Sequence, residues 1–471
     1  MEKGEGGGMT EILKRNKALS VSPLKASQPI GGSLATLGFN RAMPMLHGSQ
    51  GCTAFAKVFF VRHFREPIPL QSTAMDQSSS VLGADENVVV GLKTIAEKSR
   101  PALITILTTG LAETQGADVH RNVREFRAAH PEFDDVAVVA VNTPDFTGSV
   151  ETGYAATLTE IIRTLVPDAK EAGTLPGWRR RQVNVLVSYM LTPGDLEALR
   201  DIFEQFQLRP VFVPDLSDSL DGCLTEDDFS PVTIGGTPLS EMETLGHAKA
   251  TVVIGASLQK AADLLEEKTG VPTYRFDHLY GLHANDALIS ALAEISGMDV
   301  PERIERQRSQ LQDAMLDTHF MLGQLRIAIA ADADLLHALV DQVQEMGAEV
   351  VAAVTSCNTP QLAGIPVASI KIGDLEDMEL IAKANNAQLV IGNSHAVDSA
   401  ERLGTPILRA GFPLYDIIGG YQKTWIGYKG SRQTLFDLAN LVINHAHEEI
   451  PVYRSVYAQK PANEASAPSC H

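Results

Sequence analysis

RIAIAAD (residues 326–332), EVVAAVTS (349–356) and AQLVIGNS (387–394) are three short apolar runs in the last third of the chain. Each run is rich in alanine or β-branched residues, and a longer amphipathic stretch follows each one. Strand-like runs that alternate with helix-like stretches predict a parallel sheet covered by helices. This stretch therefore decides the fold class, which is α/β.

The same alternation continues toward the N-terminus. The further strands that we predict are LITIL (103–107), VAVVAV (136–141), VNVLV (183–187), VFVP (211–214) and TVVIG (251–255). A helix should begin at Pro193 with Thr192 as its cap, because threonine is favoured before a first helical turn that starts with proline. A long helix without internal Gly or Pro is predicted over residues 302–322, where it should bridge two units.

A linker marked by proline, LPGW (175–178), separates the first unit from the second. We therefore predict three Rossmann-like domains with parallel sheets flanked by helices. Their predicted boundaries are 26–178, 179–318 and 319–459, with an N-terminal arm (1–25) before them and a disordered tail (460–471) after them. Residues 1–8 are set aside as an expression remnant or leader.

Composition restricts the classes of partner. The chain has 471 residues, too many for one core, and its 39 Lys and Arg against 58 Asp and Glu give a net charge of −19. This charge disfavours binding to nucleic acid. Arg179, Arg180 and Arg181 form the one compact basic run, which we interpret as a solvated linker before the strand at 183–187. No apolar run reaches the roughly 18 residues of a membrane helix, and scattered cysteines indicate a reducing, cytoplasmic location.

One cysteine stands in a glycine-flanked loop, HGSQGC (47–52). The chain's four cysteines are Cys52, Cys223, Cys357 and Cys470, and none forms a C-x-x-C pair. Iron–sulfur clusters are normally held by four thiolates, so the other ligands of any cluster at Cys52 should come from another polypeptide. Gly51 fits such a site because glycine lets the backbone approach a cluster. Taken alone, a free cysteine is most often a small buried side chain.

The chain resembles the nitrogenase β-subunit family over nearly its whole length. The resemblance rests on segments 23–39, 47–67, 107–118, 141–154, 228–242, 301–319, 391–396 and 409–416, in this order and spacing. In catalytic β subunits three cysteines of the first half ligate the eight-iron P-cluster. Only Cys52 matches one of them, since Ser27 and Gly110 stand at the other two positions. This departure indicates the scaffold branch of the family, on which the iron–molybdenum cofactor precursor matures.

The resemblance implies a set of cofactors and partners. It implies a 4Fe–4S cluster shared between Cys52 and three cysteines of an α-like partner, in an α2β2 heterotetramer. The cofactor precursor is expected in the α-like chain, where molybdenum and homocitrate are inserted. The nitrogenase iron protein and precursor-delivery proteins are the other expected partners. This chain by itself is expected to be non-catalytic.

Other residues near the motif have two interpretations each. Ser27 and Gly110 are expected to line the wall of the cluster site. Ser149 matches a position that touches the P-cluster in catalytic subunits, although a turn or helix-cap role is the better interpretation. His47 could donate a hydrogen bond to a sulfur atom, or it could anchor the loop.

No other motif predicts a reaction. Cys223 and Cys357 lack neighbouring ligands at metal-binding spacing, and His278 and His283 are read as structural. The sequence contains no P-loop and no H-E-x-x-H or G-x-S-x-G motif. Three alternatives remain open: a catalytic nitrogenase β subunit, a subunit of dark-operative protochlorophyllide reductase, and a metal-free α/β protein whose cleft binds a small molecule.

Overall fold

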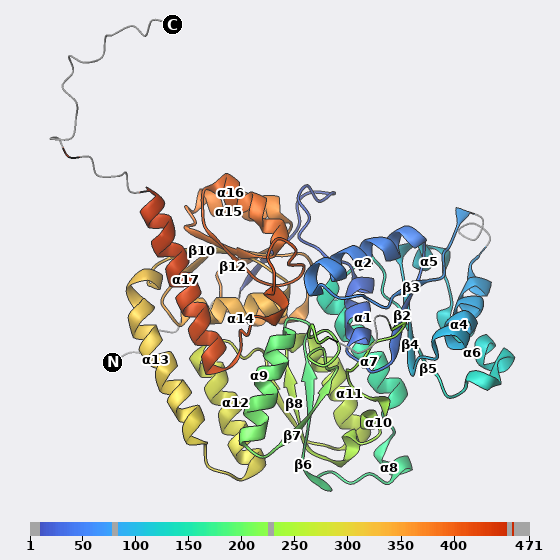
Figure 1. Cartoon of the computed structure of the whole chain (residues 1–471). Coiled ribbons are helices and arrows are strands. Elements are labelled where there is room, and N and C mark those ends of the chain that lie inside the picture. Colours follow the sequence, from blue (N-terminus) through green and yellow to red (C-terminus); the bar gives the residue numbers. More distant parts are fainter. Residues whose placement is uncertain (1–9, 78–82, 225–229, 450–454, 456–471) are drawn as a thin grey trace, which may run out of the picture.

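The computed structural model of the chain (Figure 1) describes residues 10–77, 83–224, 230–449 and 455. The predicted leader (1–8) and tail (460–471) lie outside the described residues, as does Cys470. The strands of the described part form three separate sheets, and every strand pair in them is parallel. Helices flank the sheets, so the predicted α/β class is confirmed.

The first sheet has the strand order β3-β2-β4-β5. Its strands are β2 (Ala42–His47), β3 (Gln71–Ser72), β4 (Leu103–Thr108) and β5 (Ala137–Val141). The accompanying helices are α1 (Gln28–Leu37), α2 (Gln50–Phe64), α4 (Asp85–Ser99), α5 (Gly110–Gln115), α6 (Val119–Ala129), η1 (Pro131–Phe133) and α7 (Val150–Leu165). Strand β2 was not predicted, because Pro44 in its middle lacks the backbone N–H that a central strand normally donates.

The second sheet has the order β7-β6-β8-β9. Its strands are β6 (Arg179–Val187), β7 (Arg209–Val213), β8 (Ala248–Ile254) and β9 (Thr273–Phe276). Its helices are α8 (Ala169–Ala172), α9 (Pro193–Gln205), α10 (Leu239–Met242), η2 (Leu245–His247), η3 (Ala256–Leu258), α11 (Gln259–Thr269) and α12 (Gly281–Ser296). The predicted cap of α9 is confirmed, since Thr192 Oγ1 accepts a hydrogen bond from the backbone N–H of Asp195 (3.0 Å).

The basic run lies inside a strand and not before it. Strand β6 begins at Arg179, and the side chains of Arg179, Arg180 and Arg181 are exposed. The interpretation of this run as a linker is therefore wrong. Arg179 pairs with Ala248 across an irregular register, which extends the sheet toward solvent past the apolar part of the strand. Solvent exposure of the run was predicted correctly.

The third sheet has six strands in the order β1-β12-β11-β10-β13-β14. Its strands are β1 (Glu11–Leu13), β10 (Arg326–Ala330), β11 (Glu349–Thr355), β12 (Ser369–Ile372), β13 (Leu389–Gly392) and β14 (Ile407–Arg409). Its helices are α13 (Glu302–Leu322), α14 (Ala333–Gln344), η4 (Pro360–Gly364), α15 (Leu375–Ala384), η5 (Ser394–Ala396), α16 (Val397–Leu403), η6 (Gly420–Gln422) and α17 (Gly427–Glu449). The N-terminal arm thus contributes an edge strand to the sheet of the last unit.

Helix α13 has the predicted bounds and packs along α17, as the two parallel rods at one side of Figure 1 show. Among the described residues, no helix has both the length and the apolar character that crossing a membrane requires. One continuous cluster of buried apolar residues includes Leu107, Val185 and Ile329 from the three sheets. The units therefore share a core and are not joined by linkers alone.

Helix α1 is buried along its whole length. Its sequence, QPIGGSLATL, is mostly apolar or small, as burial on every side requires, and the amide of Gln28 donates to the carbonyl oxygens of Pro144 and Thr147. It packs closely against α7, because a Cβ atom at Gly31 would lie 1.8 Å from the carbonyl oxygen of Val150. Tyr154 of α7 donates its hydroxyl hydrogen to the carbonyl of Val187 (3.0 Å) and so ties the first sheet to the second.

Candidate functional site

The predicted site residues gather at one edge of the first sheet. Strands β2, β4 and β5 are parallel, so their carboxyl ends lie together, and His47 pairs in register with Thr108. The chain leaves these ends toward α2, α5 and α7. Cys52 and Gly110 lie on the first two of these helices, and Ser149 is the N-cap residue of α7. In parallel α/β sheets this edge is the usual place for a ligand.

The turn between β2 and α2 is held by its neighbours. The carbonyl oxygen of His47 accepts hydrogen bonds from the backbone N–H (3.1 Å) and hydroxyl (2.9 Å) of Thr109. The carbonyl oxygen of Gly48 accepts the backbone N–H of Met75 (2.9 Å). A Cβ atom at Gly48 would lie 2.5 Å from Thr109 Oγ1, so only glycine fits there. The turn is consequently fixed before any partner binds.

Cys52 lies in the first turn of α2, whereas the sequence predicted a loop through residue 52. The helix begins at Gln50, and the Cys52 thiol is exposed with Ser49 Oγ at 3.4 Å. A helix N-terminus carries a partial positive charge that favours an anionic ligand such as a thiolate. Gly51 is also exposed, and a Cβ atom there would meet only Ser49 Oγ at 3.9 Å. The backbone beside Cys52 is therefore open to a bulky group.

The ring of His47 points into the protein. The side chain is fully buried, with Nδ1 3.0 Å from Thr73 Oγ1, and Nε2 has no hydrogen-bond partner among the described residues. Burial lowers the pKa of His47 to about 4, so the ring is neutral at pH 7. These contacts agree with the loop-anchoring interpretation of His47.

The other predicted residues occupy helix starts. Ser27 precedes α1 at the N-cap position, although its hydroxyl makes no capping hydrogen bond. The backbone N–H of Gly110, the first residue of α5, donates to Asp145 Oδ2 (3.0 Å). Lys25 Nζ donates to the carbonyl of Asp145 (2.9 Å), so the segments around residues 25, 110 and 145 are connected. Ser149 is buried at the N-cap position of α7. Its backbone N–H donates to Thr152 Oγ1 (2.8 Å), whereas its own hydroxyl makes no capping hydrogen bond.

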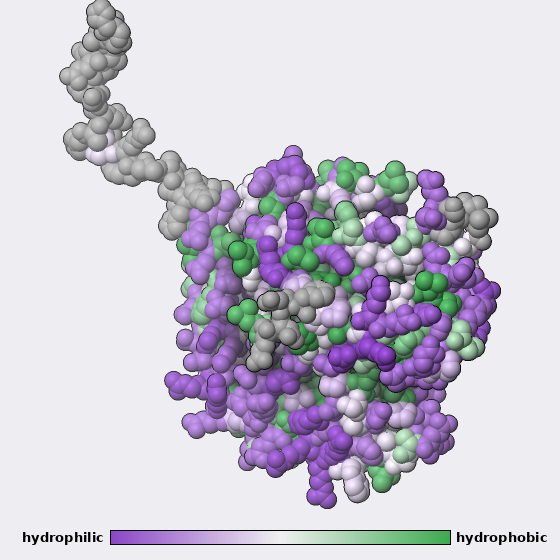
Figure 2. All heavy atoms as spheres, turned by 45° about the vertical axis from the view of Figure 1, so that its right-hand side comes forward, coloured by the Kyte–Doolittle hydropathy of each residue, from purple (hydrophilic) through white to green (hydrophobic). Residues whose placement is uncertain are grey.

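Three large apolar side chains lie on the exposed side of α2, and the sequence pattern did not single them out. Phe55, Val58 and Val61 are 67%, 49% and 44% exposed, while Phe60 on the opposite side is fully buried. Their spacing of three residues continues from Cys52, so successive members are neighbours on the helix surface, although the series winds around the axis by about 60° per step. We call Cys52, Phe55, Val58 and Val61 the α2 stripe. Figure 2 shows that apolar side chains interrupt the polar surface on this side of the molecule.

A buried carboxylate cluster joins the three units near the first-sheet site. Glu151 Oε2 of α7 accepts the backbone N–H of Asp334 (2.8 Å), and Asp334 Oδ2 accepts the hydroxyl of Ser188 (2.7 Å). Burial raises the pKa of Glu151 well above its usual range and that of Asp334 to about 6. Sequence reasoning missed this cluster because its members are distant in the chain.

A cavity of about 580 Å³ lies beside this cluster. Its lining comes from all three units and includes Thr152, Ser257, Lys260, His337 and Gln361.

The remaining described cysteines have different surroundings. Cys223 is exposed in the segment after β7, and Cys357 is half-buried after β11. Burial raises the pKa of the Cys357 thiol to about 11, and the nearby Asp332 carboxylate adds to this effect. Cys357 is therefore protonated at pH 7 and poorly suited to bind iron as a thiolate.

Comparisons with known proteins agree with this geometry. The profile of the family described as "Nitrogenase component 1 type Oxidoreductase" matches residues 27–443. The chain belongs to the nitrogenase component 1 family.

Within the family, its relatives place it on the NifN branch. It is 46% identical to the "Nitrogenase iron-molybdenum cofactor biosynthesis protein NifN" of Klebsiella pneumoniae, over 97% of this chain and 98% of that protein. It is 44% identical to the NifN protein of Bradyrhizobium diazoefficiens, over 93% of each chain. A solved structure described as "Nitrogenase Cp1 at pH 6.5" superposes with a TM-score of 0.85 at 29% identity, over 94% of this chain and 97% of that one.

Proposed function

We propose that this chain takes part in the biosynthesis of the iron–molybdenum cofactor, as the β-like subunit of a NifEN-type α2β2 scaffold in the cytoplasm. Its similarity to proteins named for that role, over nearly the full length of both chains, supports the general function. The observation that supports the specific role is the exposed Cys52 thiol at the start of α2.

The residues of the site fit a one-cysteine share of an iron–sulfur cluster. Cys52 offers a thiol on an open surface, whereas Ser27 and Gly110 offer none. A Cβ atom at Gly110 would have its nearest neighbour at 3.5 Å, an ordinary contact, so packing does not require glycine there. The site therefore lacks two thiolates that an eight-iron cluster would need, and it suits a 4Fe–4S cluster completed by a partner.

The partner that completes the site is a NifE-like α subunit that contributes three cysteines. The α2 stripe supports this pairing, because a row of exposed apolar side chains beside a metal ligand is typical of an interface. The cofactor precursor remains in the α subunit. The shared cluster, when bound, would transfer single electrons in the reaction between the nitrogenase iron protein and the scaffold. Delivery proteins bring the precursor to the scaffold.

The division into domains 26–178, 179–318 and 319–459 stays a prediction. The presence of three separate sheets supports it.

The experiment is to express the chain with its NifE-like partner, purify the complex without oxygen, and measure iron and low-temperature EPR. We expect Cys52→Ala to lose about four irons per αβ pair while the tetramer stays assembled. Cys223→Ala is the matched control, since Cys223 is also exposed but lies outside the site. Equal iron content and spectra in wild type and Cys52→Ala would refute the proposed ligand.

A further inference from the structure

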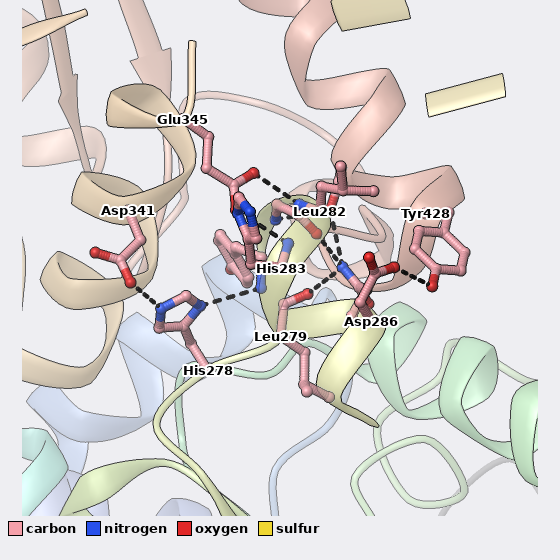
Figure 3. Close-up of polar contacts among 12 residues, drawn as sticks. His278, Leu279, Leu282, His283, Asp286, Asp341, Glu345 and Tyr428 are labelled. Carbon is pink, nitrogen blue, oxygen red and sulfur yellow. Dashed lines mark hydrogen bonds and ion pairs between the residues drawn. The ribbon is translucent and has the colours of Figure 1, made fainter. Parts of the chain in front are cut away.

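Three potential metal ligands converge between the second and third units. His278 follows β9, and His337 and Asp341 lie one turn apart on the same face of α14. One ligand atom from each residue can be chosen so that all three lie within 4.8 Å of one another. Figure 3 shows His278 pointing from its loop toward Asp341 on the neighbouring helix.

The three side chains lie close together, and the contacts between them differ in length. His278 Nε2 lies 2.8 Å from Asp341 Oδ2, His337 Nε2 lies 3.6 Å from the same oxygen, and the two imidazole rings are 5.0 Å apart. The side chains are 6% (His278), 13% (His337) and 32% (Asp341) exposed. Asp341 thus lies between the two largely buried imidazole rings, and part of its side chain is exposed to solvent.

We propose that His278, His337 and Asp341 form a binding site for a divalent transition-metal ion of the Zn²⁺ class. Two imidazoles and one carboxylate suit such ions, and three protein ligands leave a coordination position for water or a bound molecule. His337 lines the cavity of about 580 Å³, so an ion held there borders that space. Asp277 also lines the cavity and adds negative charge beside His337.

The surroundings hold the ligands in position. Glu345 follows α14 one turn beyond Asp341, and its carboxylate accepts the backbone N–H groups of Leu282 (2.7 Å) and His283 (3.1 Å). These bonds fix the segment after His278 against α14, as Figure 3 shows. Support of this kind orients metal ligands and strengthens binding.

Binding requires one change in His278. The backbone N–H of Tyr280 donates to His278 Nδ1 at 3.3 Å, so the ring proton is on Nε2 and points to Asp341. An ion at Nε2 takes the place of that proton, Nδ1 becomes the protonated nitrogen, and the long contact with Tyr280 is lost. No proton is gained or lost in this step, because the proton moves from Nε2 to Nδ1 of the same ring, and binding adds only the charge of the ion.

The test uses the anaerobic complex with the partner, dialysed against Zn²⁺ and then analysed for zinc and iron separately. We expect about one tightly bound zinc per chain and a zinc-edge X-ray absorption spectrum with imidazole scattering. His337→Gln and Asp341→Asn should each weaken zinc binding at least about tenfold and leave the iron content unchanged. His120→Gln is the matched control, because His120 is exposed on α6 of the first unit and belongs to neither ligand set.

Several outcomes overturn the proposal: no zinc bound by wild type, equal zinc in wild type and both ligand variants, or the same loss in His120→Gln. Thermal unfolding of each variant shows whether it is folded, and Asp341→Asn provides a second reading if His337→Gln is not. The zinc site is independent of the proposed cluster. Cys52→Ala should lose iron and keep zinc, so failure of one assignment leaves the other intact.

Discussion

Gly110 and Gly31 show how differently two glycines can be constrained. At Gly110 a side chain would meet its nearest neighbour, the Cβ atom of Asp145, at an ordinary 3.5 Å. At Gly31, in the buried α1 helix, a Cβ atom would lie 1.8 Å from the carbonyl oxygen of Val150. Packing thus explains Gly31 but not Gly110, which has no side chain and so leaves its own position without a thiol.

Alanine substitutions at the two glycines should separate packing from chemistry. Alanine normally stabilises a helix over glycine by about 1 kcal/mol, but the clash at Gly31 should reverse the sign. We expect Gly31→Ala to lower the free energy of unfolding by roughly 3 kcal/mol or to prevent folding. Gly110→Ala should change it by less than about 1 kcal/mol. Urea unfolding measures both, and equal midpoints for the two variants would contradict the argument.

Helix α2 links the site to the third unit through its buried face. His63 is buried on that face, and its Nδ1 accepts the backbone N–H of Leu414 (2.9 Å) from the segment after β14. Its ring also stacks edge-on against Phe412. The helix that carries Cys52 at one end is thus fixed at the other end by a histidine that must stay neutral.

This neutrality predicts a pH dependence. Burial lowers the pKa of His63 to about 3, whereas in the unfolded chain it is 6.5. Between these values the unfolded state binds the proton more readily, so the free energy of unfolding falls as the pH falls below about 6.5. We expect wild type to lose about 2 kcal/mol more than His63→Gln between about pH 7 and about pH 5.

Urea unfolding at the two pH values measures this difference. Asp195 and Asp334, whose pKa values burial raises to about 6, change stability in the opposite direction. Both aspartates are present in wild type and variant, so their effect cancels in the comparison. Parallel pH profiles for the two proteins would show that His63 does not titrate as expected.

The elements that the sequence predicted are those with local signals. The run at 183–187, the cap at Thr192 and the helix at 302–322 all contain their own periodicity or cap, and the structure has them. Strand β2 was missed because Pro44 argues against a central strand. Strand β1 was missed because it pairs with Ser369–Lys371, more than three hundred residues away, and nothing in its own three residues requires that partner.

The two candidate sites also differ in whether the sequence alone could predict them. The motif around Cys52 is contiguous, so sequence alone was sufficient to single it out, although α2 begins at Gln50 and includes Cys52 in its first turn. The His278, His337 and Asp341 group comes from two segments about sixty residues apart. Only the packing of α14 against the loop after β9 brings these side chains together. Contacts of this type depend on tertiary structure and leave no pattern in the chain.

At the scale of the whole molecule, buried hydrogen bonds connect the three units. Glu151 of the first unit and Asp334 of the third are hydrogen-bonded, and Asp334 also accepts hydrogen bonds from Ser188 and Ser257 of the second. Strand β1 adds the N-terminal arm to the third sheet. Because these contacts connect the three units, the chain can bind a partner through Cys52 and the α2 stripe without rearrangement. The entropic cost of association is therefore lower.

Because Cys52 and the α2 stripe are already in position for binding, substitutions in the stripe should weaken assembly with the partner. Phe55 and Val58 are exposed about one and two turns beyond Cys52 on α2, so Phe55→Ser and Val58→Ser should weaken the complex with the NifE-like partner and leave the chain folded. A central apolar residue in an interface contributes about 2 kcal/mol or more, which is a loss in affinity of roughly thirtyfold. Leu380→Ser on α15 is the matched control, since that leucine is 62% exposed and lies in the third unit.

Size-exclusion chromatography with light scattering, run on co-expressed complexes, gives the mass of the assembly. Iron analysis of the same fractions then shows whether assembly and cluster retention fail together. Both should fail in the stripe variants, because three of the four proposed thiolates leave with the partner, and neither should fail in Leu380→Ser. An α2β2 mass that is unchanged in Phe55→Ser and Val58→Ser would place the partner on another face, and Cys52 would then have no source for its remaining ligands.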